Sequence, residues 1–294
     1  MRKNFTPYIA AGVLSWAVIG GMSNDAQGQI YTTSAGTGTI GYYDSSGTPI
    51  NSALVSGLDA PYALWLYEND IFVANFGSGT IGEYTTSGAT VNASLISGLS
   101  GPAGLTVSGG KIYVANWSSG TIGEYTTSGA TVNASLITGL SNPTGISLAA
   151  GNLYVASYGS GTVGEYTTSG TMVNASLITG LSNPSGLSLS AGNLYVANSG
   201  SGTIGEYTTS GTTVNDSLIT GLSTPAGVTV TGTNLFVANY ASGTIGQYTT
   251  AGATVNASLI TGLSNPTSVT PEPGTLALLG MGGLSALLVR RHRK

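Results

Sequence analysis

The sequence contains no cysteine, and its only histidine, His292, lies among arginines near the C-terminus. The absence of cysteine excludes disulfides, thiolate nucleophiles and cysteine metal sites, so an exported chain of this kind depends on packing for its stability. A Ser-His-Asp triad needs a histidine as its base, and hydroxyl groups without a neighbouring base are weak nucleophiles. We therefore expect that the protein is not an enzyme and that it holds no metal and no cofactor.

Charged residues are also scarce, at 6% of the 294 residues. Lys111 is the only basic residue between Gln29 and Thr270. Because recognition of a nucleic acid depends on clustered Lys and Arg that neutralise phosphates, this composition excludes a nucleic acid as a partner of the central region. With so few charges, the groups that interact with water at the surface must be mainly Ser, Thr and Asn side chains and backbone groups.

What the sequence has instead is a tandem repeat. Equivalent segments open at Ile30, Ile71, Ile112, Leu153, Leu194 and Leu235, so the period is 41 residues without insertion. Within each copy, short runs of β-branched and aromatic residues are bounded by Gly, Ser, Asn and Pro, which is typical of strands. In the third copy the predicted strands are 112–115, 121–127, 132–138 and 145–149. Pro143 places 139–143 in a loop, because proline cannot donate a ladder hydrogen bond.

Four antiparallel strands in about 40 residues form one blade of a β-propeller. The array begins with three strands of a blade, within 30–56, and ends with a lone strand at 267–270. Pairing of the lone strand with the first three would complete a sixth blade and leave no free inner edge. We predict an all-β six-bladed β-propeller over residues 29–270, closed by its C-terminal strand and flanked by hydrophobic helices at both ends. An open solenoid of the same units is the alternative.

The repeated unit has the pattern N-P-x-G, followed by N-L-Y-V-A-N-x-x-S-G-T-I-G-E-Y. It resembles the NHL-type repeat of six-bladed propellers and of the related gluconolactonase-like propellers. The Asp and Arg usual in such repeats are replaced by Asn116 and Thr121 in the third copy. The resemblance implies the fold, and NHL propellers bind proteins, RNA or ligands. The alternative function is a gluconolactonase-like hydrolase that uses the channel mouth, where Asp59 is the only acidic residue expected.

The N-terminal residues have the order of a secretory signal. Arg2 and Lys3 precede an apolar run at 9–21, and small and polar residues follow up to Gly28. We predict a signal peptide over residues 1–28. An uncleaved anchor helix is the alternative.

The C-terminal residues 271–294 begin with Pro271, Glu272 and Pro273, continue with a short apolar stretch at 276–289 and end with a basic cluster. About 14 helical residues span about 21 Å, less than the roughly 30 Å of a bilayer core, so this short transmembrane helix is expected to be a transient inner-membrane anchor. The order closely resembles the PEP-CTERM sorting signal of Gram-negative bacteria. The resemblance implies an exosortase-like processing enzyme, cleavage near Pro271 to Pro273, and release to the cell surface or the extracellular polysaccharide matrix. A plain C-terminal membrane anchor is the alternative.

One loop position differs between copies that are otherwise nearly identical. It lies between the first and second strands of each copy and holds Ala35, Phe76, Trp117, Tyr158, Ser199 and Tyr240. The aromatic side chains could stack on sugar rings and the preceding amides could bind sugar hydroxyls, so an exopolysaccharide or a surface protein is the candidate partner. The candidate ligand-binding residues are Phe76, Trp117, Tyr158, Tyr240, Asn75, Asn116, Asn198 and Asn239. In the alternative, each aromatic packs on the neighbouring blade and each Asn closes an Asx turn.

Three further features have structural interpretations. Trp65 replaces the Ser or Thr of the other copies, and it either plugs the channel or packs between blades. The sequons that begin at Asn92, Asn133, Asn174, Asn215 and Asn256 recur with the repeat, and we expect strand hydrogen bonds there rather than glycans. One glutamate recurs in four copies, too far from its equivalents to share a metal ion, and is expected to be a solvated charge: Glu83, Glu124, Glu165 and Glu206.

Overall fold

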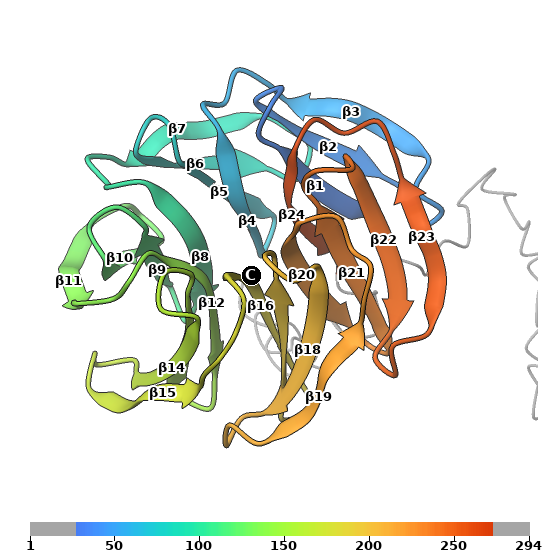
Figure 1. Ribbon diagram of the computed structural model, residues 1–294. Coiled ribbons are helices and arrows are strands. Elements are labelled where there is room, and N and C mark those ends of the chain that lie inside the picture. Colours follow the sequence, from blue (N-terminus) through green and yellow to red (C-terminus); the bar gives the residue numbers. More distant parts are fainter. Residues whose placement is uncertain (1–27, 273–294) are drawn as a thin grey trace, which may run out of the picture.

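The computed structural model describes residues 28–272, which contain 24 β-strands and no helix. The strands form six four-stranded antiparallel sheets that are arranged as blades around a common axis (Figure 1). The predicted all-β six-bladed propeller is therefore confirmed. Residues 1–27 of the predicted signal peptide and the hydrophobic part of the sorting tail lie outside the described residues, and so do the two predicted flanking helices. No helix within residues 28–272 is long and apolar enough to cross a membrane.

We number the blades in chain order, and each blade runs from its inner strand to its outer strand. Blade 1 contains β24 (Pro266–Pro271), β1 (Ile30–Ser34), β2 (Thr39–Tyr43) and β3 (Pro49–Val55). Blade 2 contains β4 (Pro61–Tyr67), β5 (Asp70–Asn75), β6 (Thr80–Thr85) and β7 (Thr90–Ile96). Blade 3 contains β8 (Pro102–Ser108), β9 (Lys111–Asn116), β10 (Thr121–Thr126) and β11 (Thr131–Ile137).

The remaining three blades repeat the same order. Blade 4 contains β12 (Pro143–Ala149), β13 (Asn152–Ser157), β14 (Thr162–Thr167) and β15 (Met172–Ile178). Blade 5 contains β16 (Pro184–Ser190), β17 (Asn193–Asn198), β18 (Thr203–Thr208) and β19 (Thr213–Ile219). Blade 6 contains β20 (Pro225–Thr231), β21 (Asn234–Asn239), β22 (Thr244–Thr249) and β23 (Thr254–Ile260). The prediction that Pro143 lies in a loop is wrong: it opens β12, because the first residue of a strand needs no ladder donor.

The ring closes as predicted, by pairing the last strand with the first. Strand β24 lies antiparallel to β1, with Thr32 opposite Val269 and Ile30 opposite Pro271. One further backbone bond, from the Glu272 N–H to the Gln29 carbonyl at 2.7 Å, extends the pairing beyond the strand ends. The red end of the described chain therefore lies beside its blue beginning (Figure 1). An open solenoid is excluded.

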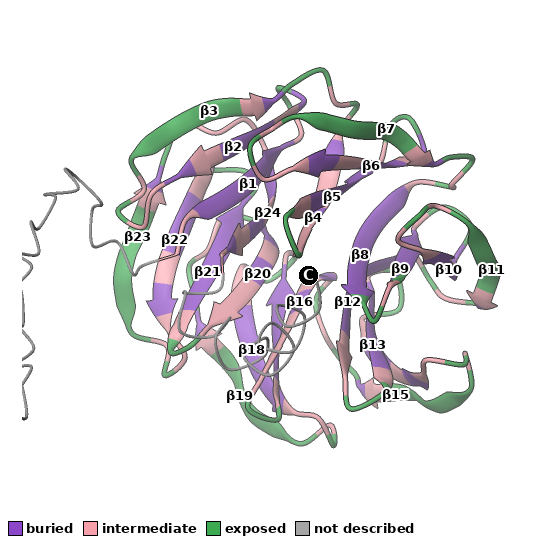
Figure 2. Ribbon diagram, turned by 180° about the vertical axis from the view of Figure 1, so that it is seen from behind, coloured by how far each residue is buried: buried purple, intermediate pink, exposed green. Residues whose placement is uncertain are grey.

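The hydrophobic core lies between adjacent blades. One cluster combines Tyr113 and Ile122 of blade 3 with Ile146, Leu153 and Tyr166 of blade 4, and equivalent clusters recur around the ring. The second strand of each blade is covered on both faces, which is why its sequence is a continuous apolar run instead of an alternating one. The outer strands are exposed over most of their length, and they form the green circumference in Figure 2.

The inner strands approach one another closely, and the sequence makes room for this. A Cβ atom at Gly104 would lie 1.8 Å from the Thr144 carbonyl oxygen, so only glycine fits between the inner strands of blades 3 and 4. Hydroxyl groups then satisfy carbonyls on these edges: Ser147 Oγ donates to Leu187 O at 2.9 Å, and Thr229 Oγ1 donates to Val269 O at 2.6 Å. The six inner strands thus enclose a narrow axial space.

Candidate functional site

The predicted rim of loops is present at one end of the propeller axis. The loop that follows each second strand bonds to the loop that precedes the inner strand of its own blade, as the Phe76 N–H does to the Ala60 carbonyl at 3.0 Å. Phe76, Trp117 and Tyr158 are half-buried, and Tyr240 is 38% exposed. The rings of Trp117 and Tyr158, from neighbouring blades, have their centroids 4.9 Å apart. Trp117 and Tyr158 therefore pack partly on each other, and all four aromatic side chains keep part of their surface open to solvent.

Tyr62 is a fifth aromatic residue at this rim, which the sequence prediction missed. It belongs to β4, and its ring centroid lies 5.8 Å from that of Phe76. Burial, followed by the nearby hydroxyls of Tyr158 and Tyr240, raises the pKa of Tyr62 to about 12. The signal was present in the repeat, because the equivalent positions hold only small residues: Ala103, Thr144, Ser185, Ala226 and Thr267. We call Tyr62, Phe76, Trp117, Tyr158 and Tyr240 the rim aromatics.

The four candidate asparagines lie beneath the loops and not on the surface. Asn75, Asn116, Asn198 and Asn239 are at most 4% exposed. Each side-chain amide N–H donates to the threonine five residues later, as Asn75 Nδ2 does to Thr80 Oγ1 at 3.3 Å. Their Oδ1 atoms have no hydrogen-bond partner within residues 28–272, so these side chains do not close the Asx turns of the alternative. A ligand on the rim would contact the aromatic residues before it reached these amides.

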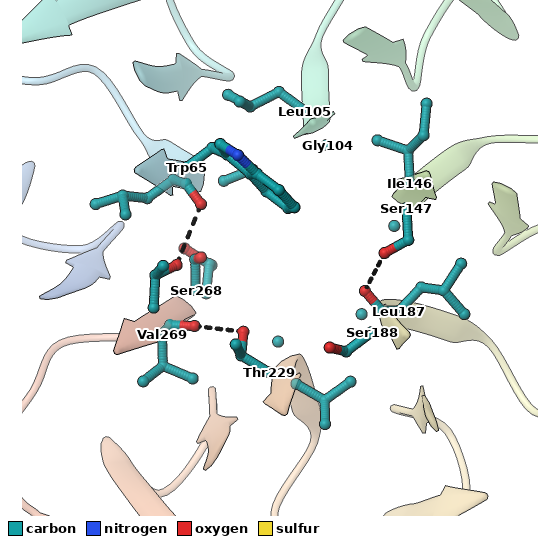
Figure 3. Close-up of a pocket in the computed structure, with 18 of the residues that line it drawn as sticks. Trp65, Gly104, Leu105, Ile146, Ser147, Leu187, Ser188, Thr229, Ser268 and Val269 are labelled. Carbon is teal, nitrogen blue, oxygen red and sulfur yellow. Dashed lines mark hydrogen bonds between the residues drawn. The ribbon is translucent and has the colours of Figure 1, made fainter. Parts of the chain in front are cut away.

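The inner strands surround an axial cavity of about 410 Å³. Its wall combines aliphatic side chains with serine and threonine hydroxyls, and no Asp, Glu, Lys, Arg or His lines it. Trp65 faces this cavity (Figure 3), and it also packs against the core cluster between blades 2 and 3 that contains Phe72, Leu105 and Val107. Trp65 thus packs between blades, which was one of the two expectations, and it lies on the cavity wall. The expectation that it plugs the channel is wrong, because a cavity of about 410 Å³ remains beside it.

Two of the four recurring glutamates, Glu124 and Glu206, are not the solvated charges that we expected, whereas Glu83 and Glu165 are half-buried. Glu124 and Glu206 are 4% and 8% exposed, because the second strand of the same blade covers them. Glu206 Oε1 accepts hydrogen bonds from Asn193 Nδ2 at 2.7 Å and from the Tyr195 hydroxyl at 3.0 Å. Together with burial, this carboxylate raises the pKa of Tyr195 to about 12. Glu124, Glu165 and Glu206 therefore contact polar side chains of their own blades. Among the described residues, no group of acidic or histidine side chains could hold a metal ion.

The sequon asparagines lie on the exposed outer strands. Asn133 Oδ1 accepts a hydrogen bond from the N–H of Ser135 at 3.1 Å, and the equivalent residues of the other blades repeat this local turn. The expected hydrogen bonds are thus present, although they are local and do not connect strands.

These features define the class of the protein: a six-bladed β-propeller with an aromatic rim and an uncharged axial cavity. Solved structures confirm the fold. A crystal structure of a nidogen/laminin complex is 17% identical, with a TM-score of 0.70 over 83% of this chain and 97% of that chain. A streptogramin B lyase structure is 22% identical, with a TM-score of 0.66 over 86% of both chains. A catalytically inactive virginiamycin B lyase from Staphylococcus aureus with quinupristin is 20% identical, with a TM-score of 0.61 over 81% of this chain and 86% of that chain.

The particular kind of propeller is indicated by the end of the chain. Residues 269–294 match the PEP-CTERM protein-sorting motif, which includes Pro271, Glu272 and Pro273. The chain is thus a propeller with an exosortase-type sorting signal, which directs it to the cell surface or the extracellular space. No curated protein matches its sequence significantly.

Proposed function

We propose that this protein is a non-enzymatic binding module of the surface or extracellular matrix of a Gram-negative bacterium, and that its rim aromatics bind a neutral exopolysaccharide. The observation that carries the proposal is the gathering of five aromatic side chains on a rim whose loops contain one charged residue, Asp59. Aromatic faces stack on the C–H faces of sugar rings, and each aromatic side chain offers a large apolar contact area for this.

The surroundings of the rim aromatics suit a neutral sugar chain. The exposed hydroxyl residues Ser78, Ser118 and Ser160 lie in the same loops as Phe76, Trp117 and Tyr158, and they can exchange hydrogen bonds with sugar hydroxyls. An anionic polymer would need arginine or lysine, which these loops lack. The rim therefore offers stacking and hydrogen bonding without charge selection.

The direction of the closing strand supports this role. Strand β24 begins at the rim, where the Asn265 carbonyl accepts the Ala35 N–H at 3.1 Å, and it ends at the opposite face, where Pro271 pairs with Ile30. The sorting motif thus leaves the propeller on the face away from the rim aromatics. While the tail is held by a membrane or a processing enzyme, the rim faces outward toward the matrix.

The alternative is a hydrolase at the channel mouth, resembling gluconolactonase. It would need carboxylates or amides that converge on a calcium ion, and the mouth offers only Asp59 as an acid. A hydrolase also needs a general base, often a histidine. The single histidine belongs to the sorting motif, so the rim has no histidine to act as a base. These features favour the binding role.

The test is a comparison of two triple variants across blades 2, 3 and 4. One replaces Phe76, Trp117 and Tyr158 by alanine; the matched control replaces the exposed outer-strand residues Val91, Val132 and Val173 by alanine. Binding to purified exopolysaccharide from a matrix-forming host is measured by affinity electrophoresis and titration calorimetry. We expect a loss of at least about tenfold for the rim variant only, since three stacking contacts are removed. Equal binding by all three proteins, or none by the unmodified chain, would exclude glycan recognition by this rim.

A further inference from the structure

Strand β4 breaks the symmetry of the axial cavity. Trp65 stands where the other inner strands carry a hydroxyl residue: Thr106, Ser147, Ser188, Thr229 and Thr270. Three residues earlier, Tyr62 replaces the small residues of the other strands. Both side chains line the cavity. In a chain of nearly identical copies, the cavity therefore has one aromatic wall and five walls of small, aliphatic and hydroxyl groups.

The size and chemistry of the cavity match a small-molecule site. Its volume of about 410 Å³ falls in the range of about 300–1,000 Å³ that is usual for ligand pockets. Since no ionisable side chain other than Tyr62 lines it, a charged ligand would lose its hydration without gaining a partner ion. The cavity thus selects a neutral ligand.

The wall across from Trp65 carries hydrogen-bonding groups (Figure 3). Ser188 Oγ accepts the Val230 N–H at 3.1 Å, and its own hydrogen has no acceptor among residues 28–272, so it is free to donate. Ser147 Oγ donates to Leu187 O at 2.9 Å and retains a lone pair that can accept. A ring seated on the indole would therefore face one donor and one acceptor.

Tyr62 separates this cavity from the rim. Its side chain lines the cavity, and its ring centroid lies 5.8 Å from that of Phe76 at the rim. Tyr62 therefore lies where the cavity meets the rim. A polymer that lies on the rim and a ligand inside the cavity would occupy different sites.

We infer that the axial cavity binds a neutral aromatic small molecule, which stacks on Trp65 and forms hydrogen bonds with Ser147 and Ser188. This site does not depend on glycan binding by the rim. It gives the propeller a second binding function, for an uncharged ligand that is smaller than a polysaccharide.

The inference is tested with two dyes that share a ring system and differ in charge. N-phenyl-1-naphthylamine is neutral, and 8-anilinonaphthalene-1-sulfonate carries a sulfonate. We expect the neutral dye to bind the full chain once, with energy transfer from tryptophan, and the sulfonate to bind at least about tenfold more weakly. Trp65→Thr restores the residue type of the other repeats, and it should weaken binding of the neutral dye at least about tenfold. Trp65→Phe keeps a ring and should bind within about threefold of the unmodified protein.

The rim provides the matched control. Trp117→Thr removes the same side chain outside the cavity and should leave dye binding unchanged, although it should weaken glycan binding. The inference is overturned if a folded Trp65→Thr variant binds the neutral dye as well as the unmodified protein does. It is also overturned if the unmodified protein binds both dyes equally, binds several dye molecules per chain, or binds no dye. If Trp65→Thr does not fold, Ser188→Leu, which fills the cavity from the opposite wall, replaces it in the test. Loss of dye binding in the folded Ser188→Leu variant supports the inference, and retained dye binding overturns it.

Discussion

The closing strand β24 offers the most direct test of how the propeller is held together. We compare a chain that ends at Glu272, and keeps the strand, with a chain that ends at Asn265, and lacks it. Both begin at Gly28. Removal of β24 exposes the edge of β1 and the core between blades 6 and 1, to which Val269 contributes a side chain that is 1% exposed.

The structure sets the size of the effect. Burial of Val269 contributes about 1.5–3 kcal/mol to the free energy of unfolding. Four hydroxyl bonds link β24 to its neighbours, and the longest, from Thr270 to Leu64 O at 3.3 Å, is left out of the sum. The other three are Thr33 with Thr267 at 2.8 Å, Thr267 to Pro61 O at 3.0 Å, and Thr229 to Val269 O at 2.6 Å. At about 0.5–1.5 kcal/mol each, they bring the loss to about 3–7 kcal/mol, while the backbone ladder roughly offsets the entropy of ordering the strand. For about 250 residues, a loss near 5 kcal/mol lowers the melting temperature by about 10–20 °C.

The assay is thermal unfolding followed by circular dichroism. We expect the chain that ends at Asn265 to melt about 10–20 °C lower, or not to fold. A synthetic peptide of residues 266–272 should restore part of the difference, because it can add to the free edge of β1. Equal melting temperatures for the two chains would refute the closed ring as the source of stability. Failure of the peptide alone would show only that it pairs too weakly when it is not tethered.

Three further predictions concern ionisable groups. Glu206→Gln should lower the free energy of unfolding by about 1–3 kcal/mol in chemical denaturation, because the charged hydrogen bond to Tyr195 is lost. Glu83→Gln should raise the melting temperature slightly, because burial and the nearby Asp70 raise the pKa of Glu83 and make its charged form unfavourable; a decrease would contradict this account. Burial holds the pKa of both Tyr62 and Tyr195 at about 12, above the ordinary value of 10.0, so the folded state retains protons that the unfolded state loses. Stability should therefore fall as the pH rises from about 10 to 12, and a pH-independent melting temperature in that range would contradict it.

The sequence predicted the ring because the repeat carries the information in local form. Each 41-residue copy specifies four strands by its apolar runs and glycine turns, and the odd strand left at the end has one place to pair. Boundaries were accurate to one or two residues, and Pro143 was the visible exception. A fold in which repeats adjacent in space are also adjacent in sequence is the easiest kind to predict from composition and spacing.

Side-chain environments were less predictable, since they depend on strand register. Glu206 was expected in solvent because a glutamate usually lies there, but pairing of β18 with β17 places it opposite Tyr195. Asn116 was expected on the rim because it precedes a loop, yet it is the last residue of β9 and lies inside. Tyr62 could have been found by aligning the six copies, because it is the only large residue at a position where the other five copies have small residues. It was overlooked because its position near the axis follows only from the assembled ring.

The last strand gives the propeller and the sorting signal a common boundary. Pro271 pairs with Ile30, and Glu272 is bonded to the Gln29 carbonyl and, through Oε1, to the Tyr31 hydroxyl at 3.0 Å. The first two residues of the Pro-Glu-Pro motif are therefore part of the closed ring, with no spacer between them and β24. Since the same residues complete blade 1 and begin the signal, the tail leaves the propeller at a fixed point and on a fixed face. The described part of the signal therefore ends on the face of the ring opposite the rim aromatics.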